Sequence, residues 1–344
     1  SIIGLRKSIF FLLGLFFCSS TIASERLELF FLSEQLLSKR ILSFSDAMRF
    51  NIKSRSLGFE GISAEQRQNH TVGIDRAIYP IFAYSDNING GNLSQTIQVG
   101  DFTFVGSEET RAKSGIIVGG GIYLGIKKQY GRGRYADVNI NASLTAAPAH
   151  DWLKIRNESL TVCSKNHVKE WRFFDICASW SHNKRQFSDV INKSILASFS
   201  RLFVSGKTFN ETSLAAKRFI SKEYQQMQGI VTLNSMLPNG FKTHLSMTAG
   251  EPVKDFISLN YSLGIAVSRL INKKSLKLSF NQTFYNGVSF LGIDREDKTQ
   301  QISVSYPVFK GFNLSVGYTI NESSINSFSH SGPLVSISLP KQSF

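Results

Sequence analysis

The feature that most constrains the fold of this chain is an apolar–polar alternation of period two that runs from about Val72 to the C-terminal region. Because successive side chains of a β-strand point to opposite faces, each alternating segment has one apolar and one polar face. The pattern therefore predicts an all-β fold, although by itself it also fits a soluble sandwich or barrel. The clearest apolar set lies within residues 256–269: Ile257, Leu259, Tyr261, Leu263, Ile265 and Val267.

Three features favour a membrane barrel over a soluble sheet. The predicted strands have about 10–13 residues, which matches the ~9–11 of a tilted membrane strand better than the ~5–6 usual in soluble proteins. Their polar face carries small, neutral residues, as a lumen would. Short turns at 238–240, 272–274 and 310–311 alternate with longer loops at 250–255, 288–299 and 321–333. Outer-membrane barrels have short periplasmic turns and longer outer loops.

The alternation yields fifteen candidate strands, but single-chain bacterial barrels have an even number. We therefore reject segment 95–105 and predict a transmembrane antiparallel β-barrel of about 14 strands, preceded by a short helical or irregular N-terminal segment. The candidates are 72–84, 95–105, 114–127, 133–147, 153–164, 171–182, 190–205, 208–223, 225–236, 240–250, 256–269, 275–287, 299–308, 311–321 and 333–341.

The N-terminal residues predict export. Arg6 and Lys7 precede an apolar run from Ile9 to Cys18, and small residues follow as far as Ser24. This order is typical of a secretory signal peptide over residues 1–23, cut after Ala23. A spanning helix would need about 20 apolar residues, so the run is too short to be one. A buried core helix and a lipoprotein cut at Cys18 are the alternatives.

Residues 24–71 are predicted to be a periplasmic, partly helical segment, with the outer-membrane β-barrel over residues 72–344. Leucines from 27 to 37 recur at helical spacing, Ser43–Met48 resembles a helix start, and residues 51–70 suggest a loop or tether. We expect this segment to enter the lumen or to cover its periplasmic mouth, although it could instead recruit a client protein. In the first case its basic residues would meet acidic lumen groups: Arg40, Arg49, Lys53 and Arg55.

Three short stretches carry a family resemblance. They are Tyr84-Ser-Asp-Asn-Ile-Asn-Gly-Gly, Tyr130-Gly-Arg-Gly-Arg-Tyr and the closing unit Leu314-Ser-Val-Gly-Tyr-Thr-Ile-Asn-Glu-Ser-Ser-Ile. Over about residues 72–344 the chain resembles the C-terminal barrel of the surface lipoprotein assembly modifier family. The resemblance implies a fourteen-stranded outer-membrane barrel that helps lipoproteins reach the cell surface, without catalytic residues. Members usually place a larger helical-repeat domain before the barrel.

Cys163 and Cys177 are candidates for a disulfide. Both have lumen parity on neighbouring predicted strands, around the connection 166–170. Antiparallel neighbours on one face come within bonding distance, and the periplasm is oxidising. Two unpaired small side chains are the alternative.

The chain is basic, with 39 Lys and Arg against 25 Asp and Glu and a formal net charge of +14. Candidate lumen or interface residues are Lys127, Lys128, Arg132 and Arg134. They could contact lipid phosphates or make a positive lumen for small anionic solutes in a passive porin-like channel. We expect no enzymatic activity, cofactor or metal. The expected partners are outer-membrane lipid, the barrel assembly machinery and, from the resemblance, a lipoprotein client, but no nucleic acid.

We predict that the mature protein fractionates with the outer membrane and migrates heat-modifiably on a gel. The export signal and the long alternating strands together motivate this expectation. Fractionation followed by electrophoresis with and without boiling checks it, and recovery in the soluble periplasm would contradict it.

Overall fold

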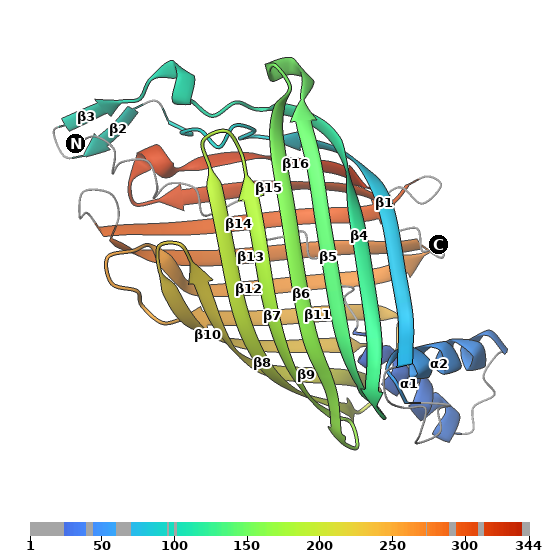
Figure 1. Cartoon of the computed structure of the whole chain (residues 1–344). Coiled ribbons are helices and arrows are strands. Elements are labelled where there is room, and N and C mark those ends of the chain that lie inside the picture. The colour runs from blue at the N-terminus through green and yellow to red at the C-terminus, as the bar shows by residue number, and fades with distance from the viewer. Residues whose placement is uncertain are drawn as a thin grey trace.

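A computed structural model describes residues 24–38, 44–59, 70–94, 96–99, 102–272, 274–288, 294–308 and 313–338. Fourteen antiparallel strands form a closed barrel in which each strand pairs with its neighbours in sequence and the first pairs with the last (Figure 1). The barrel strands are β1 (His70–Ser85), β4 (Gly115–Gly131), β5 (Arg134–Ala147), β6 (Leu153–Lys169), β7 (Arg172–Lys184), β8 (Asp189–Ser205), β9 (Thr208–Ser221), β10 (Gln225–Met236), β11 (Phe241–Gly250), β12 (Ser258–Ile271), β13 (Lys274–Val288), β14 (Asp294–Pro307), β15 (Asn313–Ser323) and β16 (His330–Ser338).

The rejected candidate, segment 95–105, indeed lies outside the barrel. It forms a separate two-stranded hairpin of β2 (Thr96–Val99) and β3 (Phe102–Val105) within the long connection from β1 to β4. The predicted fold class and strand number are therefore confirmed. β14 begins at Asp294 rather than at residue 299, because its pairing with β13 continues outward as far as Val288.

The two faces of the wall follow the predicted parity. Leu263, Leu278, Val304 and Val316 are exposed apolar side chains on the outer face. On the opposite parity, Ser303 faces the lumen, where its Oγ lies 2.7 Å from Ser279 Oγ. An outer wall of exposed aliphatic side chains is stable only against lipid, so the protein is an integral outer-membrane barrel.

Leu259 is the exception. As a member of the apolar set within residues 256–269 it is expected to face lipid, and this expectation is wrong. The β12–β13 register shifts between Leu259 and Tyr261, so Asn260 is an extra, unpaired residue. Beyond this bulge, Leu259 lies opposite Tyr285, which shares the lumen parity of Thr283. One inserted residue exchanges the two faces of a strand.

The two ends of the barrel differ in their connections. At one end the strands are joined by the short turns 132–133, 170–171, 206–207 and 237–240. The other end has the longest connections, 86–114 and 251–257, together with the shorter ones 148–152, 185–188 and 222–224. Short turns are typical of the periplasmic end. The N-terminal helices α1 (Glu25–Leu37) and α2 (Phe44–Ser56) lie at this short-turn end (Figure 1).

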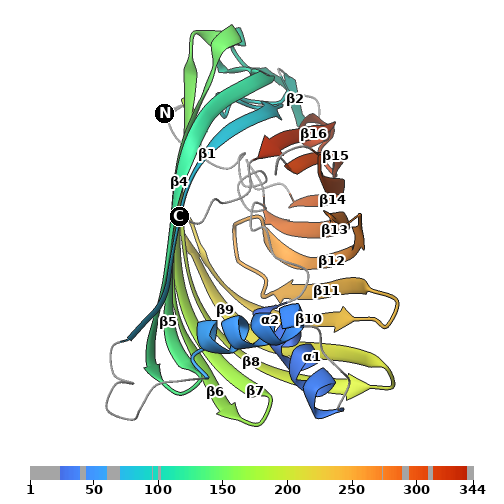
Figure 2. The ribbon, with the colours of Figure 1, turned by 90° about the vertical axis from the view of Figure 1, so that its right-hand side faces the viewer.

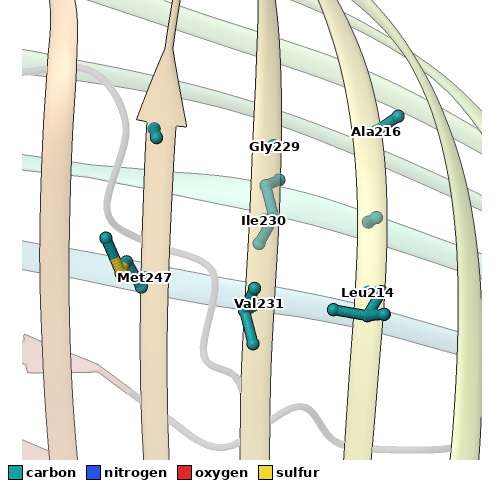
Figure 3. A pocket seen from close by; sticks show the side chains of 8 residues that line it. Leu214, Ala216, Gly229, Ile230, Val231 and Met247 are labelled. Carbon is teal, nitrogen blue, oxygen red and sulfur yellow. The ribbon is translucent and has the colours of Figure 1, made fainter.

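A shallow apolar depression interrupts the outer face of β9, β10 and β11. Gly229 forms its floor, opposite Ala216 and Ala249 on the two neighbouring strands. Leu214, Val231 and Met247 form its rim (Figure 3). Because Leu214, Val231 and Met247 are exposed on the outer face, the depression belongs to the lipid-facing wall and not to the lumen. No helix in the described ranges is long and apolar enough to span a membrane.

The faces predict unequal tolerance to charge. We expect Leu278→Arg or Val316→Arg to destabilise the folded barrel by about 2–4 kcal/mol, because Arg would enter the hydrocarbon layer. The matched lumen variant Ser303→Arg should lower the free energy of unfolding far less. Reversible urea unfolding in lipid vesicles measures the difference, and equal losses at both positions would contradict the assigned faces.

Candidate functional site: the occupied periplasmic mouth

The periplasmic mouth of the barrel is occupied by α1 and α2, which we call the plug. Figure 2 shows both helices against the ends of the barrel strands, with α1 beside β8, β9 and β10. Side chains of α1 contact residues of β4, β7, β9 and β11. The helix therefore touches the wall around about half of the ring of strands.

Apolar side chains seat α1 on more than one of its faces. Leu27 and Phe30 form one buried cluster with the wall residues Phe173 and Leu202. Leu29, on another face of the helix, is buried in a second cluster with Leu57 and Tyr135. A helix that is apolar on several faces belongs in an enclosed position. Inside the mouth the barrel wall and α2 supply these surroundings.

A buried ion pair fixes the start of α1 to the wall. The guanidinium of Arg26 donates two hydrogen bonds to the carboxylate of Asp175 on β7, at 2.7 and 2.9 Å. Both side chains are more than nine-tenths buried. The same guanidinium lies 4.1 Å from the ring centroid of Phe173. Two parallel bonds define direction as well as distance, so this pair specifies how the helix lies in the mouth.

Two further carboxylates of α1 bind wall lysines. Glu25 accepts from Lys127 of β4 at 2.7 Å, and Glu28 accepts from Lys242 of β11 at 2.9 Å and from Lys53 of α2. Burial alone would raise the pKa of Glu28, but the hydrogen bonds from Lys242 and Lys53 outweigh it and hold the pKa below its usual value. This contribution to docking is present above the ordinary glutamate pKa and is lost as pH falls through the lowered one.

The end of α2 joins the plug to the β4–β5 turn. The backbone N–H of Gly133 donates to the carbonyl of Gly58 at 2.8 Å, and the side chain of Gln129 donates to the same carbonyl. Gly133 has φ of +67°, and a Cβ there would lie 2.9 Å from the ring of Phe59. Glycine is therefore required for both the turn and the close approach of the plug.

The structure separates the four candidate basic residues into two groups. Lys127 faces the lumen and binds the plug through Glu25. Arg132 lies in the β4–β5 turn, while Lys128 and Arg134 are exposed with the parity of the outer wall. Lys128 and Arg134 therefore do not line the lumen.

One of the basic residues expected to meet lumen carboxylates forms its ion pair within the plug. Lys53 pairs with Glu28 of α1 instead of a lumen carboxylate, and Arg49 and Arg55 are exposed on α2. Arg40 lies outside the described residues. The lumen carboxylate is met by Arg26, which the sequence analysis did not single out. The predicted tether over residues 51–70 is also wrong at its start, because α2 continues to Ser56.

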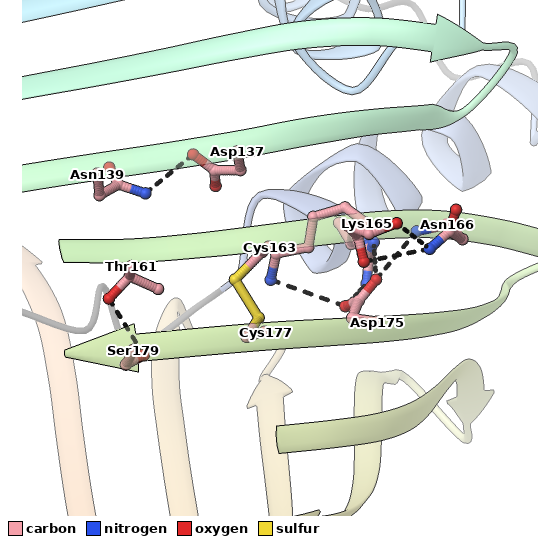
Figure 4. The surroundings of a disulfide bond; sticks show 11 residues. Asp137, Asn139, Thr161, Cys163, Lys165, Asn166, Asp175, Cys177 and Ser179 are labelled. Carbon is pink, nitrogen blue, oxygen red and sulfur yellow. Dashed lines mark hydrogen bonds and ion pairs between the residues drawn. A yellow bond between two sulfur atoms is a disulfide. The ribbon is translucent and has the colours of Figure 1, made fainter. Parts of the chain in front are cut away.

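A disulfide joins Cys163 and Cys177, which lie directly opposite each other on β6 and β7. Asp175 and Lys165 occupy the next lumen positions toward the plug, 3.7 Å apart (Figure 4). The backbone N–H of Asn166 also donates to Asp175, at 3.1 Å. The covalent bond therefore fixes the two strands beside the carboxylate that holds Arg26.

Part of the long connection between β1 and β4 forms a compact loop at the outer end of the barrel. Asn87 and Asn89 are fully buried, and their amides bind the backbone around Gly91. Between them, Ile88 packs on Ala147 and Ile155. The first stretch of the family resemblance thus forms part of this loop.

Arg185, in the β7–β8 connection, holds this loop from the other side. Its guanidinium donates to the carbonyl of Asn87, and burial lowers the pKa of Arg185 from its ordinary value despite the nearby carboxylate of Asp86. The two ends of the barrel therefore differ: the plug lies at the periplasmic end, and a hydrogen-bonded loop bound to the β7–β8 connection lies at the outer end. Within the described part of the chain, no cluster of three or more His, Cys, Asp or Glu could hold a metal ion.

The closed antiparallel wall, its apolar outer face and its occupied mouth define an integral outer-membrane β-barrel protein. No family model and no curated protein matches the chain. Among solved structures it is similar to the outer membrane protein opdK of Pseudomonas aeruginosa, with 7% identity over 77% of this chain and 97% of that chain and a TM-score of 0.41. It is also similar to a BenF-like porin of Pseudomonas fluorescens Pf-5, with 8% identity over 79% of this chain and 99% of that chain and a TM-score of 0.40.

The barrel rests on its own strand pairing, and the site rests on the contacts of the plug.

We predict that Asp175→Asn loosens α1 without unfolding the barrel. Arg26 would stay buried without its counter-charge, at a cost of about 3–5 kcal/mol to docking. Hydrogen exchange of the α1 amides should therefore accelerate, while exchange in the barrel strands stays unchanged. The control Ser179→Ala alters the same lumen face of β7, where Ser179 contacts Thr161 and not the plug. Equal exchange of α1 in wild type and Asp175→Asn would contradict the anchoring role.

Proposed function

We propose that this protein is an outer-membrane channel for small solutes whose periplasmic mouth is closed by a displaceable N-terminal plug. The observation that carries the proposal is that α1 is held in the mouth by hydrogen bonds and ion pairs to four strands, around a lumen lined by small polar side chains. Such contacts are separate from the strand ladder, so the plug can leave while the barrel stays closed.

The contacts of the plug support a preference for anions in the open state. In the docked state Glu25 and Glu28 neutralise the wall lysines Lys127 and Lys242. Departure of the plug would return both ammonium groups to the aqueous mouth, while Asp175, which then loses Arg26, keeps Lys165 as a cationic neighbour at 3.7 Å. Charged groups at a constriction set which ions enter. A positive mouth therefore favours small anionic solutes.

Removing the plug should raise the single-channel conductance in planar bilayers. We expect a severalfold increase on deletion of residues 24–59, since the barrel wall is complete without them. A sharper variant is Asp175→Arg, which places two guanidinium groups face to face and should expel α1. The charge swap Asp175→Arg with Arg26→Asp restores opposite charges and should return the low conductance. An unchanged conductance in both the deletion and Asp175→Arg would contradict the plug.

A second candidate is the family function, surface delivery of a lipoprotein client. One observation favours it: Leu37, Met48 and Ile52 are apolar side chains of the plug that are 74%, 55% and 56% exposed. Exposed apolar side chains on a periplasmic helix offer a surface for a partner. Recruitment through this surface would use the outside of the plug and not the lumen.

The outer surface of the plug separates the two candidates. Met48→Glu with Ile52→Glu should leave the conductance unchanged, because neither side chain is buried in the mouth. If this variant abolishes display of a lipoprotein encoded next to the gene, client delivery is favoured. If display is unaffected and only plug release changes the conductance, the channel is favoured.

A further inference from the structure

Glu211 of β9 is a buried carboxylate with no ion pair among the described side chains. It is 6% exposed and lies on the lumen face beside the start of α1. Its two hydrogen bonds come from neutral donors, the hydroxyl of Ser24 and the amide of Asn234 at 3.3 Å. The charge of Arg26 also acts on Glu211, but its guanidinium donates its two hydrogen bonds to the carboxylate of Asp175. A buried carboxylate that shares one cation with a second carboxylate is only partly compensated.

Ser24 is the residue that brings α1 to Glu211. Its hydroxyl caps the helix by accepting the backbone N–H of Leu27 at 3.0 Å, and its carbonyl accepts the N–H of Glu28 at 3.2 Å. The backbone nitrogen of Ser24 is three covalent bonds from the hydroxyl oxygen that contacts Glu211. Any charge on that nitrogen would therefore lie next to the carboxylate.

The sequence predicts a cut between Ala23 and Ser24. Hydrolysis of that peptide bond consumes one water, leaves a carboxylate on Ala23 and releases an α-amino group on Ser24. In the uncut chain the nitrogen is a neutral amide. In the processed chain it is an amine whose ordinary pKa is about 7.7–8.0, so it is largely an ammonium at neutral pH.

We propose that the α-ammonium group of processed Ser24 is the counter-charge of Glu211, so that removal of the signal peptide completes the docking of α1. An ammonium at a helix N-terminus is disfavoured by the helix dipole, and a carboxylate at that position offsets the penalty. The uncut chain lacks the charge and docks α1 less firmly. The plug therefore closes fully only after export. This inference depends on where α1 lies and holds whichever solute or client the barrel serves.

The first test is the identity of the N-terminal residue. Intact-mass analysis and N-terminal sequencing of the protein purified from outer membranes should give Ser24 as residue one. A mature chain that begins at any other residue overturns the proposal, because its ammonium would not lie beside Glu211.

The second test measures coupling between the N-terminal charge and Glu211. The mature chain is prepared with a free or an acetylated α-amine, each with Glu211 or Glu211→Gln, and refolded in detergent with heat-modifiability as the check on folding. Acetylation should accelerate hydrogen exchange of α1 by about tenfold when Glu211 is present, as loss of one charged hydrogen bond implies. In Glu211→Gln it should have little effect.

Glu25→Gln is the matched control, because it removes another carboxylate at the start of α1 whose partner is Lys127. Acetylation should still accelerate exchange about tenfold in this variant. The proposal is overturned if acetylation has the same effect with Glu211 and with Glu211→Gln. It is also overturned if acetylation changes nothing in the protein that retains Glu211.

Discussion

A chain that crosses lipid with strands has to satisfy every backbone N–H and C=O within the protein, and a closed ladder is the only sheet that does so. Here the pairing of β1 with β16 provides the closure, and every other property of the wall follows from it. Closure makes one face of each strand meet lipid and the other meet the lumen. It also brings the short turns to one end, where they surround the mouth that α1 enters.

A ring of fourteen strands encloses more space than its own inward side chains fill. At the periplasmic end α1 occupies that space, and the wall is adapted to it. Phe173 and Leu202 are apolar residues at lumen positions, which would be unfavourable beside water. They are explained by Leu27 and Phe30 of the helix, which they cover. The polar remainder of the lumen has no such occupant among the described residues.

Three ion pairs bind the plug to the barrel wall, and they can break without disturbing the barrel. Arg26 with Asp175, Glu25 with Lys127 and Glu28 with Lys242 are pairs between helix and wall. All three are external to the strand ladder, so their loss does not open the barrel. The disulfide beside Asp175 belongs to the wall and fixes the position of that carboxylate whether or not the plug is present. A rigid wall with a separable helix is the physical basis of the proposed closure.

Much of the wall could be predicted from the sequence because a strand has a period of two and lipid accepts only one of its faces. That rule gave the parity of Leu278 and Val304 and the opposition of Cys163 and Cys177, while the strand number also required that such barrels have an even number of strands. It failed at Leu259, because a single bulged residue carries no signature in the alternation. A local pattern does not report where the register shifts.

The wall residues that contact the plug are only weakly indicated by the sequence. Phe173 and Phe174 are adjacent apolar residues that break the alternation, and they mark the place where the lumen face is covered. Arg26 and Asp175 are 149 residues apart, and nothing local to either residue names the other. The sequence by itself determined which face of each strand meets lipid, because that depends on neighbours along the chain. Only the tertiary structure decided which side chains hold the helix in the mouth, because those contacts depend on how the closed ring brings distant strands around one axis.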